Sequence, residues 1–185
     1  MLNRHVENLL NYLSSILFEA FTQRPESLRS GDKVEVATVL GHNTIESLVR
    51  FLAERRVEAL SYRSFADLQE FFRTRFALEI ADPDVVDDIV EAIETRNISV
   101  HNRCRINRRY VTRTGSGKER LGELRELGIH TVAPVSELML RTVRTLDARF
   151  RRKLRLAASR CELEPLFLPL GESADPAPTD PANTP

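Results

Sequence analysis

The sequence has few of the residues from which small disulfide-linked or metal-linked domains are built. Two of its 185 residues are cysteine, none is tryptophan, and aromatic residues make up 6%. The two cysteines, Cys104 and Cys161, have neither metal-ligand spacing nor the number that a disulfide framework requires. We therefore expect no metal site, no cofactor and a reducing, cytoplasmic environment.

Long apolar runs and an excess of one charge are also absent from the sequence. Crossing a bilayer requires about 18 consecutive apolar residues, and no stretch approaches that length, so we expect no membrane partner. The 27 basic and 27 acidic residues balance, which argues against a protein that coats nucleic acid. Positive charge is nevertheless concentrated at 96–120 and 141–155. The second group forms either a hydrated helix surface or a surface that binds nucleic-acid phosphates.

Apolar residues recur at three- and four-residue steps in several segments, which is the period of an amphipathic helix. This period predicts long helices at 2–22, 45–60, 64–76, 82–103 and 134–159, with a shorter helix at 118–127. Residues 33–40 have the β-branched composition of a strand, but no second strand is evident, so they are interpreted as a short helix. We predict an all-α fold, an antiparallel bundle of four to five long helices with short connecting helices.

Two further segments have no helical pattern. Residues 104–117 combine arginine, glycine and serine, which predicts a mobile surface loop. From Pro165 onward the chain is rich in proline and alanine and contains no apolar stripe. We therefore predict one helical domain at 1–164, followed by a disordered tail at 165–185.

The helix predicted at 82–103 begins as an amphipathic helix and then loses that pattern. Apolar residues from Ile89 to Ile93 define one sector of its surface. Arg96, Asn97 and His101 lie in that sector or at its edge, where further apolar residues are expected. Burying an unpaired polar group costs about 1–3 kcal/mol, so these three side chains must be paired, hydrated or functional.

The pattern Arg96-Asn97-x-x-x-His101, with the residues that follow it as far as Val111, resembles the core motif of the HEPN superfamily. These small all-helical domains are named for nucleotide binding in higher eukaryotes and prokaryotes. Many are metal-independent ribonucleases that carry an arginine, a polar residue and, a few residues further on, a histidine. The chain departs from the usual pattern at Cys104, where glycine is more common.

The resemblance implies an endoribonuclease that acts as a toxin or defence effector, in which the RNA 2′-hydroxyl attacks the neighbouring phosphate. His101 would move the proton, Arg96 would bind the phosphate, and Asn97 would orient either group. One histidine cannot easily serve on both sides of a phosphate, so the resemblance also implies a homodimer with two motifs in one cleft. The residues expected to bind RNA are Asn102, Arg103, Arg105, Arg108, Arg109 and Tyr110.

Other interpretations of the same residues stay open. The domain could be a non-catalytic HEPN module that dimerises or binds a nucleotide or a partner protein. It could also be an antitoxin-like regulatory protein whose tail binds a partner, and a toxin could itself have an antitoxin as partner. Arg125 and His130 repeat the spacing of Arg96 and His101, but an acidic residue follows this arginine, so we expect no activity from that pair.

Overall fold

A computed structural model describes residues 2–28 and 33–154, and this part of the chain is all-α, as predicted. Its α-helices are α1 (Leu2–Gln23), α2 (Val36–Leu40), α3 (Ile45–Ser61), α4 (Phe65–Phe76), α5 (Val86–His101), α6 (Arg108–Thr114) and α7 (Ile129–Leu154). The ambiguous segment 33–40 therefore ends in a short helix rather than a strand. The predicted tail at 165–185 lies outside the described residues, so the structure does not test the proposed domain boundary.

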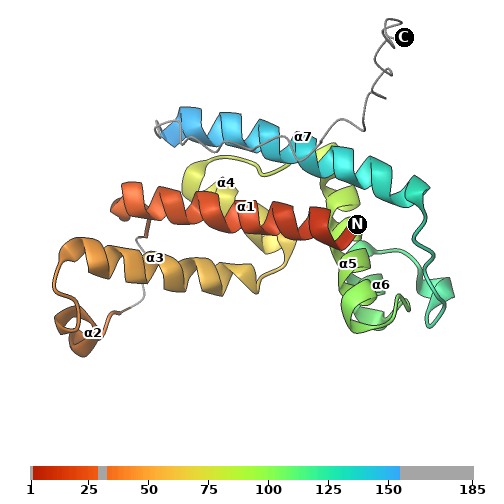
Figure 1. Cartoon of the computed structure of the whole chain (residues 1–185), viewed down its shortest axis with the longest axis horizontal. Helices are drawn as coiled ribbons and strands as arrows, with labels where there is room; N and C mark the ends of the chain where they lie inside the picture. The colour runs from red at the N-terminus through yellow and green to blue at the C-terminus, as the bar shows by residue number, and fades with distance from the viewer. Residues whose placement is uncertain (1, 29–32, 155–185) are drawn as a thin grey trace, which may run out of the picture.

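The long helices are arranged around α1, which contacts α3, α5 and α7. Figure 1 shows α3 running opposite to α1, whereas α7 runs in the same direction as α1 and lies on its other side. The segment of α5 stands at a steep angle to these three helices at the end where the chain begins (Figure 1). The arrangement thus differs from a simple antiparallel bundle, because α1 and α7 are parallel neighbours.

The main core forms where the apolar face of α1 meets α3, α4 and α7. The buried residues of α1 recur at three- and four-residue steps from Leu2 to Phe21, as the helical period requires. Phenylalanine rings fill the space between α4 and α7, and the Phe76 and Phe150 ring centroids lie 5.0 Å apart in an edge-to-face arrangement. This core fixes the part of the molecule against which α5 packs.

The segment 104–117 was predicted as a mobile loop, and this prediction is wrong because the segment contains α6. Asn107 caps the helix by accepting a hydrogen bond from the Tyr110 backbone N–H at 2.8 Å. Gly115 ends the helix in the left-handed conformation, with φ +68°. Tyr110 and Ile106 are buried against Ile98 of α5, in a second small cluster. The local caps and this burial together make the segment an ordered part of the fold.

Two predicted helix boundaries also differ from the structure. Within 118–127 only Lys118–Arg120 is helical, as a single 3₁₀ turn, and an isolated bridge between Arg105 and Leu124 follows it. The last helix begins at Ile129 rather than at Pro134. Pro134 is the sixth residue of α7, so it removes the intrahelical hydrogen bond that its N–H would donate to His130, and the helix nevertheless continues through it.

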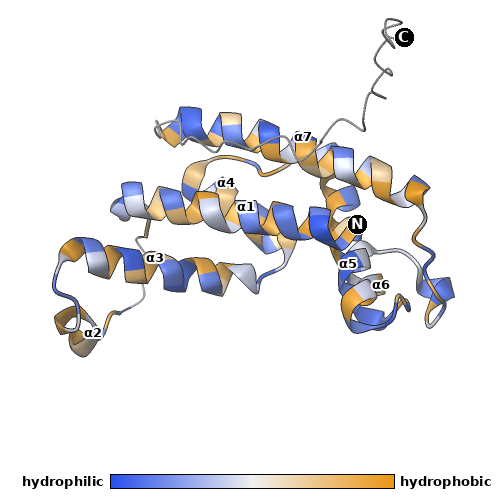
Figure 2. Ribbon diagram, viewed as in Figure 1, coloured by the Kyte–Doolittle hydropathy of each residue, from blue (hydrophilic) through white to orange (hydrophobic). Residues whose placement is uncertain are grey.

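Apolar side chains outside the core are most exposed around α2. Val36 and Leu40 are 71% and 78% exposed, and Figure 2 shows this short helix apart from the long helices. Among the described residues, no helix has both the length and the apolar character needed to span a bilayer.

Candidate functional site

The last two turns of α5 carry the predicted motif, and Arg96 is the most tightly held of its side chains. The Arg96 Nη2 atom donates a hydrogen bond of 2.7 Å to Glu7 Oε1 of α1. Its Nη1 atom approaches Asn97 Oδ1 at 3.3 Å. Only 22% of the Arg96 side chain is exposed. The structure therefore brings Arg96 and Asn97 together and adds Glu7, which the sequence pattern did not indicate because it lies 89 residues away.

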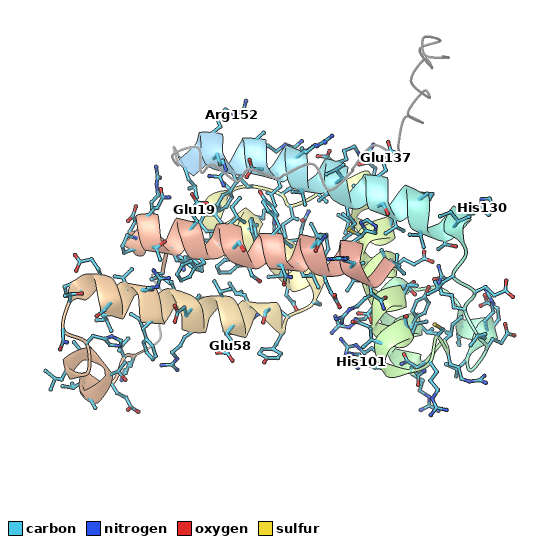
Figure 3. All side chains as sticks on the ribbon, in the orientation of Figure 1. Glu19, Glu58, His101, His130, Glu137 and Arg152 are labelled. Atoms are coloured by element: carbon cyan, nitrogen blue, oxygen red, sulfur yellow. The ribbon has the colours of Figure 1, made fainter. Side chains whose placement is uncertain are left out.

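His101 is the last residue of α5 and is exposed to solvent. It follows Asn97 by four residues, which corresponds to about 6 Å along a helix axis and nearly the same face. Figure 3 shows His101 at the end of α5 that points away from α7. The imidazole is therefore accessible to a ligand one helical turn beyond Arg96 and Asn97.

A tight turn follows His101 and uses two residues with positive φ. Arg103 and Cys104 have φ +50° and +59°, and the Cys104 N–H donates to the Ile98 carbonyl at 2.9 Å. The Asn102 side chain donates to the Arg105 carbonyl at 2.6 Å, so this predicted RNA contact also stabilises the turn. The left-handed conformation of Cys104 is one that glycine adopts without strain.

The six predicted RNA-binding residues differ in exposure. Arg103, Arg105, Arg108 and Arg109 are exposed, and Asn102 is half-buried. Tyr110 is 1% exposed, so it does not offer its ring to RNA as predicted. Its hydroxyl donates to Glu91 Oε1 at 3.2 Å, and burial raises the pKa of the Tyr110 hydroxyl above its usual value.

A buried carboxylate lies under α6 and was not predicted as part of the site. Glu94 is 3% exposed, although its position on the helical wheel places it with acidic residues that face away from the apolar sector. The Nε atoms of Arg109 and Arg113 each lie 3.6 Å from a Glu94 oxygen. The sequence signal that could have indicated this site is the spacing of the two arginines, because residues four apart lie on one face of a helix.

These elements enclose a groove of about 300 Å³ that Arg96 and Asn97 line. Its walls come from α1, the end of α3, the start of α4, α5 and α6. The remaining charged lining residues are Arg63, Glu94, Arg109 and Arg113. The groove is therefore a concave surface rimmed with arginine. Its lining on α5 ends at Asn97, and His101 lies outside it, one turn further along the helix.

The described basic residues of α7, at 141–153, lie apart from the groove and do not line it. Arg149 pairs with Asp82 at 3.1 Å, at the beginning of the segment that leads into α5. The sixteen residues of α5 extend about 24 Å, so this pair is far from His101. Arg151 is also engaged, by Glu19 and Asp147. Figure 3 likewise shows Arg152 at the opposite end of the molecule from His101.

Arg125 of the second arginine–histidine pair is as deeply set as Arg96, with 22% of its side chain exposed, and it lines a separate pocket of about 510 Å³. Arg125 donates to Glu91 Oε1 at 2.6 Å and packs over the Tyr110 ring. His130 is exposed near the start of α7, and Figure 3 shows it well separated from His101. Arg125 therefore stabilises the contact of α5 with the segment after α6, and His130 does not line the pocket that Arg125 lines.

Residues 2–28 and 33–154 contain no group of three or more histidine, cysteine, aspartate or glutamate side chains that could hold a metal ion. Comparison of the chain with models of protein families, with curated proteins and with solved structures found no match.

Proposed function

We propose that the protein is a metal-independent endoribonuclease and that Arg96, Asn97 and His101 form half of its active site. The observation that carries this proposal is the position of the three side chains. Arg96 and Asn97 line a concave, arginine-rimmed groove, and His101 is solvent-exposed on the next turn of the same helix. A phosphate-binding arginine beside an accessible histidine is suited to cleaving a phosphodiester bond.

The chemistry requires no metal ion because RNA supplies its own nucleophile. His101 accepts the proton of the 2′-hydroxyl, whose oxygen forms a bond to the adjacent phosphorus. Arg96 offsets the negative charge that grows on the phosphate oxygens in the transition state. The bond to the 5′-oxygen then breaks and that oxygen takes up a proton, which leaves a 2′,3′-cyclic phosphate and a 5′-hydroxyl end.

The proton for the leaving oxygen must come from a second acid, and we assign it to His101 of a second copy of the chain. His5 of α1 is close in sequence to Asn3 and Glu7, which bond to Ser99 and Arg96 of α5. At 100° per residue, however, His5 points to the opposite side of α1 from these two residues. The exposed end of α5 is the surface through which two copies would join their motifs.

The proposal is tested by incubating the purified protein with single-stranded RNA in excess EDTA. We expect cleavage, with product ends that a polynucleotide kinase can label because they carry a 5′-hydroxyl. If the folded dimer leaves varied RNA sequences intact, the ribonuclease assignment is wrong. In cells, expression is expected to stop growth, as a toxin or defence effector would, and a co-expressed antitoxin would relieve this effect.

A non-catalytic HEPN module is the second candidate, and the Arg96–Glu7 ion pair favours it. A 2.7 Å bond to a carboxylate occupies part of the guanidinium that would hold phosphate. In that case Arg96 and Asn97 would stabilise the contact between α5 and α1 and would bind a nucleotide or a partner protein without cleaving RNA. The Arg96→Ala variant would then lose stability or dimerisation, and the wild type would show no cleavage.

A further inference from the structure

The groove beside Arg96 and Asn97 extends well beyond the three residues of the proposed active site. Its volume of about 300 Å³ lies at the small end of the range for ligand pockets. Leucine side chains of α1, including Leu13 and Leu17, form much of its floor, and polar residues form its rim. An apolar floor with a few charged groups at the rim is typical of a site for a small ligand or for part of a longer one.

Positive charge exceeds negative charge around this groove. Its lining contains four arginines, Arg63, Arg96, Arg109 and Arg113. Three carboxylates act on these arginines. Glu7 pairs with Arg96, and Glu94 lies between Arg109 and Arg113. The charges of Arg63 and Arg113 act on the third, Asp67. Among the described residues, no carboxylate oxygen is within 4.0 Å of Arg63. One positive charge therefore remains uncompensated, and it favours an anionic ligand.

The capping residue Asp67 shows that Arg63 and Arg113 border the same part of the groove. The side-chain hydrogen bond from Ser64 holds the pKa of Asp67 below its usual value. The charges of Arg63 and Arg113 lower it further, and both arginines line the groove beside the start of α4. Arginines from the α3–α4 turn and from α6 thus converge on one opening.

Glu94 lies close to the two arginines of α6 but leaves their Nε–H groups free of a hydrogen bond to it. Its distances to the two Nε atoms, 3.6 Å each, are longer than hydrogen bonds, and its Oε2 atom is buried with no hydrogen-bond partner. The charge of Glu94 offsets the repulsion between two guanidinium groups four residues apart. A buried carboxylate with an unsatisfied oxygen is costly for a fold, which favours a role in the site.

We propose that this groove binds a phosphate group of a nucleotide through Arg63, Arg109 and Arg113, with the base stacked on Tyr62. Tyr62 lines the groove and is 82% exposed, and an aromatic ring can stack on any base. Glu94 acts as a positioning residue for the two α6 arginines. The proposal rests on the ribonuclease function proposed above, because it makes the groove the place where RNA lies beside the scissile phosphate.

The test is binding of a fluorescent single-stranded DNA oligonucleotide to the full chain, measured by anisotropy. DNA lacks the 2′-hydroxyl and so cannot be cleaved by the proposed reaction, which separates binding from catalysis. Arg63→Gln and Arg113→Gln should each weaken binding about three- to tenfold and lower the log–log salt slope by about 0.7. Arg144→Gln is the matched control, because it removes an exposed arginine of α7 that is not part of the groove.

Competition experiments then show whether the bound phosphate belongs to a nucleic acid, a free nucleotide or inorganic phosphate. The oligonucleotide, adenosine monophosphate and inorganic phosphate are compared as competitors, and Tyr62→Leu is expected to weaken the first two but not the third. Competition by the mononucleotide as strong as by the oligonucleotide would also support the phosphate site but would assign it to a free nucleotide. Circular dichroism confirms that each variant is folded.

The outcomes for the groove and for the ribonuclease are distinguishable. DNA binding that is weakened by the groove variants, without any RNA cleavage, supports nucleotide binding in the groove and contradicts the ribonuclease assignment. If RNA is cleaved but the DNA affinity is the same in Arg63→Gln, Arg113→Gln and Arg144→Gln, nucleotide binding in the groove is refuted. The ribonuclease assignment is then unaffected. No binding of any of the three phosphate compounds also overturns the groove.

Discussion

At the scale of single residues, the proposed chemistry depends on His101 and Arg96. His101→Ala and Arg96→Ala should each reduce RNA cleavage by a factor on the order of 10²–10⁴, since they remove the proton-transfer group and the phosphate clamp. The measurement is initial cleavage rate with folding checked by circular dichroism. His130→Ala is the control, because it changes an exposed histidine with the same spacing from an arginine and should leave the rate unchanged. Equal losses in all three variants would contradict the assignment.

Cys104 provides a residue-scale prediction about stability. Its φ of +59° lies in the left-handed region, where a β-branched side chain is strained by about 1–3 kcal/mol. We expect Cys104→Gly to unfold at the same denaturant concentration as the wild type or a higher one, and Cys104→Val to unfold at a clearly lower one. Urea unfolding followed by circular dichroism measures both midpoints. A glycine variant much less stable than the valine variant would show that the thiol packs in a way that the turn geometry does not explain.

At the scale of elements, the contact between α5 and α6 holds Arg109 and Arg113 in the lining of the groove. Ile98 is 2% exposed under α6, so Ile98→Ala should lower the free energy of unfolding by about 2–5 kcal/mol. The same change should weaken oligonucleotide binding, because Arg109 and Arg113 lose their fixed position. Leu140→Ala is the matched control, since Leu140 lies on α7, away from this contact, and is 42% exposed. Its effect on unfolding should stay within about 0.5 kcal/mol.

The contact between α1 and α7 gives an element-scale prediction about pH. The Tyr12 hydroxyl donates to Asp147 at 3.0 Å, and burial, followed by the Asp147 charge, raises the pKa of Tyr12 well above its usual value. A raised folded-state pKa stabilises the fold below the unfolded pKa of about 10, and this contribution is lost as the pH rises through the folded pKa.

Wild-type stability should therefore fall between pH 9 and pH 11 in urea unfolding experiments. The Tyr12→Phe variant should lose less stability over this range, because it has no hydroxyl to ionise. Tyr62→Phe serves as the control, since Tyr62 is 82% exposed, and it should follow the wild type. Identical pH profiles for the wild type and Tyr12→Phe would contradict the role assigned to the Tyr12–Asp147 contact.

At the scale of the whole molecule, the proposed site is complete only in a dimer. We expect a two-fold dimer in light scattering at micromolar concentration, because one chain supplies one accessible motif histidine beside Arg96. Val100→Arg should weaken dimerisation and cleavage together, since Val100 is exposed next to His101 and a charge there opposes its own copy across a two-fold axis. A monomer with full activity would refute the shared site. A dimer unaffected by Val100→Arg would place the interface elsewhere.

The motif helix illustrates how much of the site could be predicted from the sequence. The break in apolar periodicity at Arg96 and Asn97 correctly located polar side chains that the structure finds half-buried and paired. Periodicity could not show that Glu7 is the partner of Arg96, because contacts between helices depend on packing rather than on sequence distance. It also could not show that Glu94 is buried, since the helix that covers Glu94 lies in a segment predicted to be a loop.

The sequence by itself determined the all-α class, because apolar residues at helical spacing must be buried on one face of each helix. It also determined where several helices run, such as the helix predicted at 64–76, which the structure has as α4 (Phe65–Phe76). Only the tertiary structure decided which helices are neighbours, that α1 and α7 run in parallel, and that Tyr110 is buried. The reason is physical, since periodicity fixes which face of a helix is apolar, whereas the partner of that face is chosen by the packing of the whole chain.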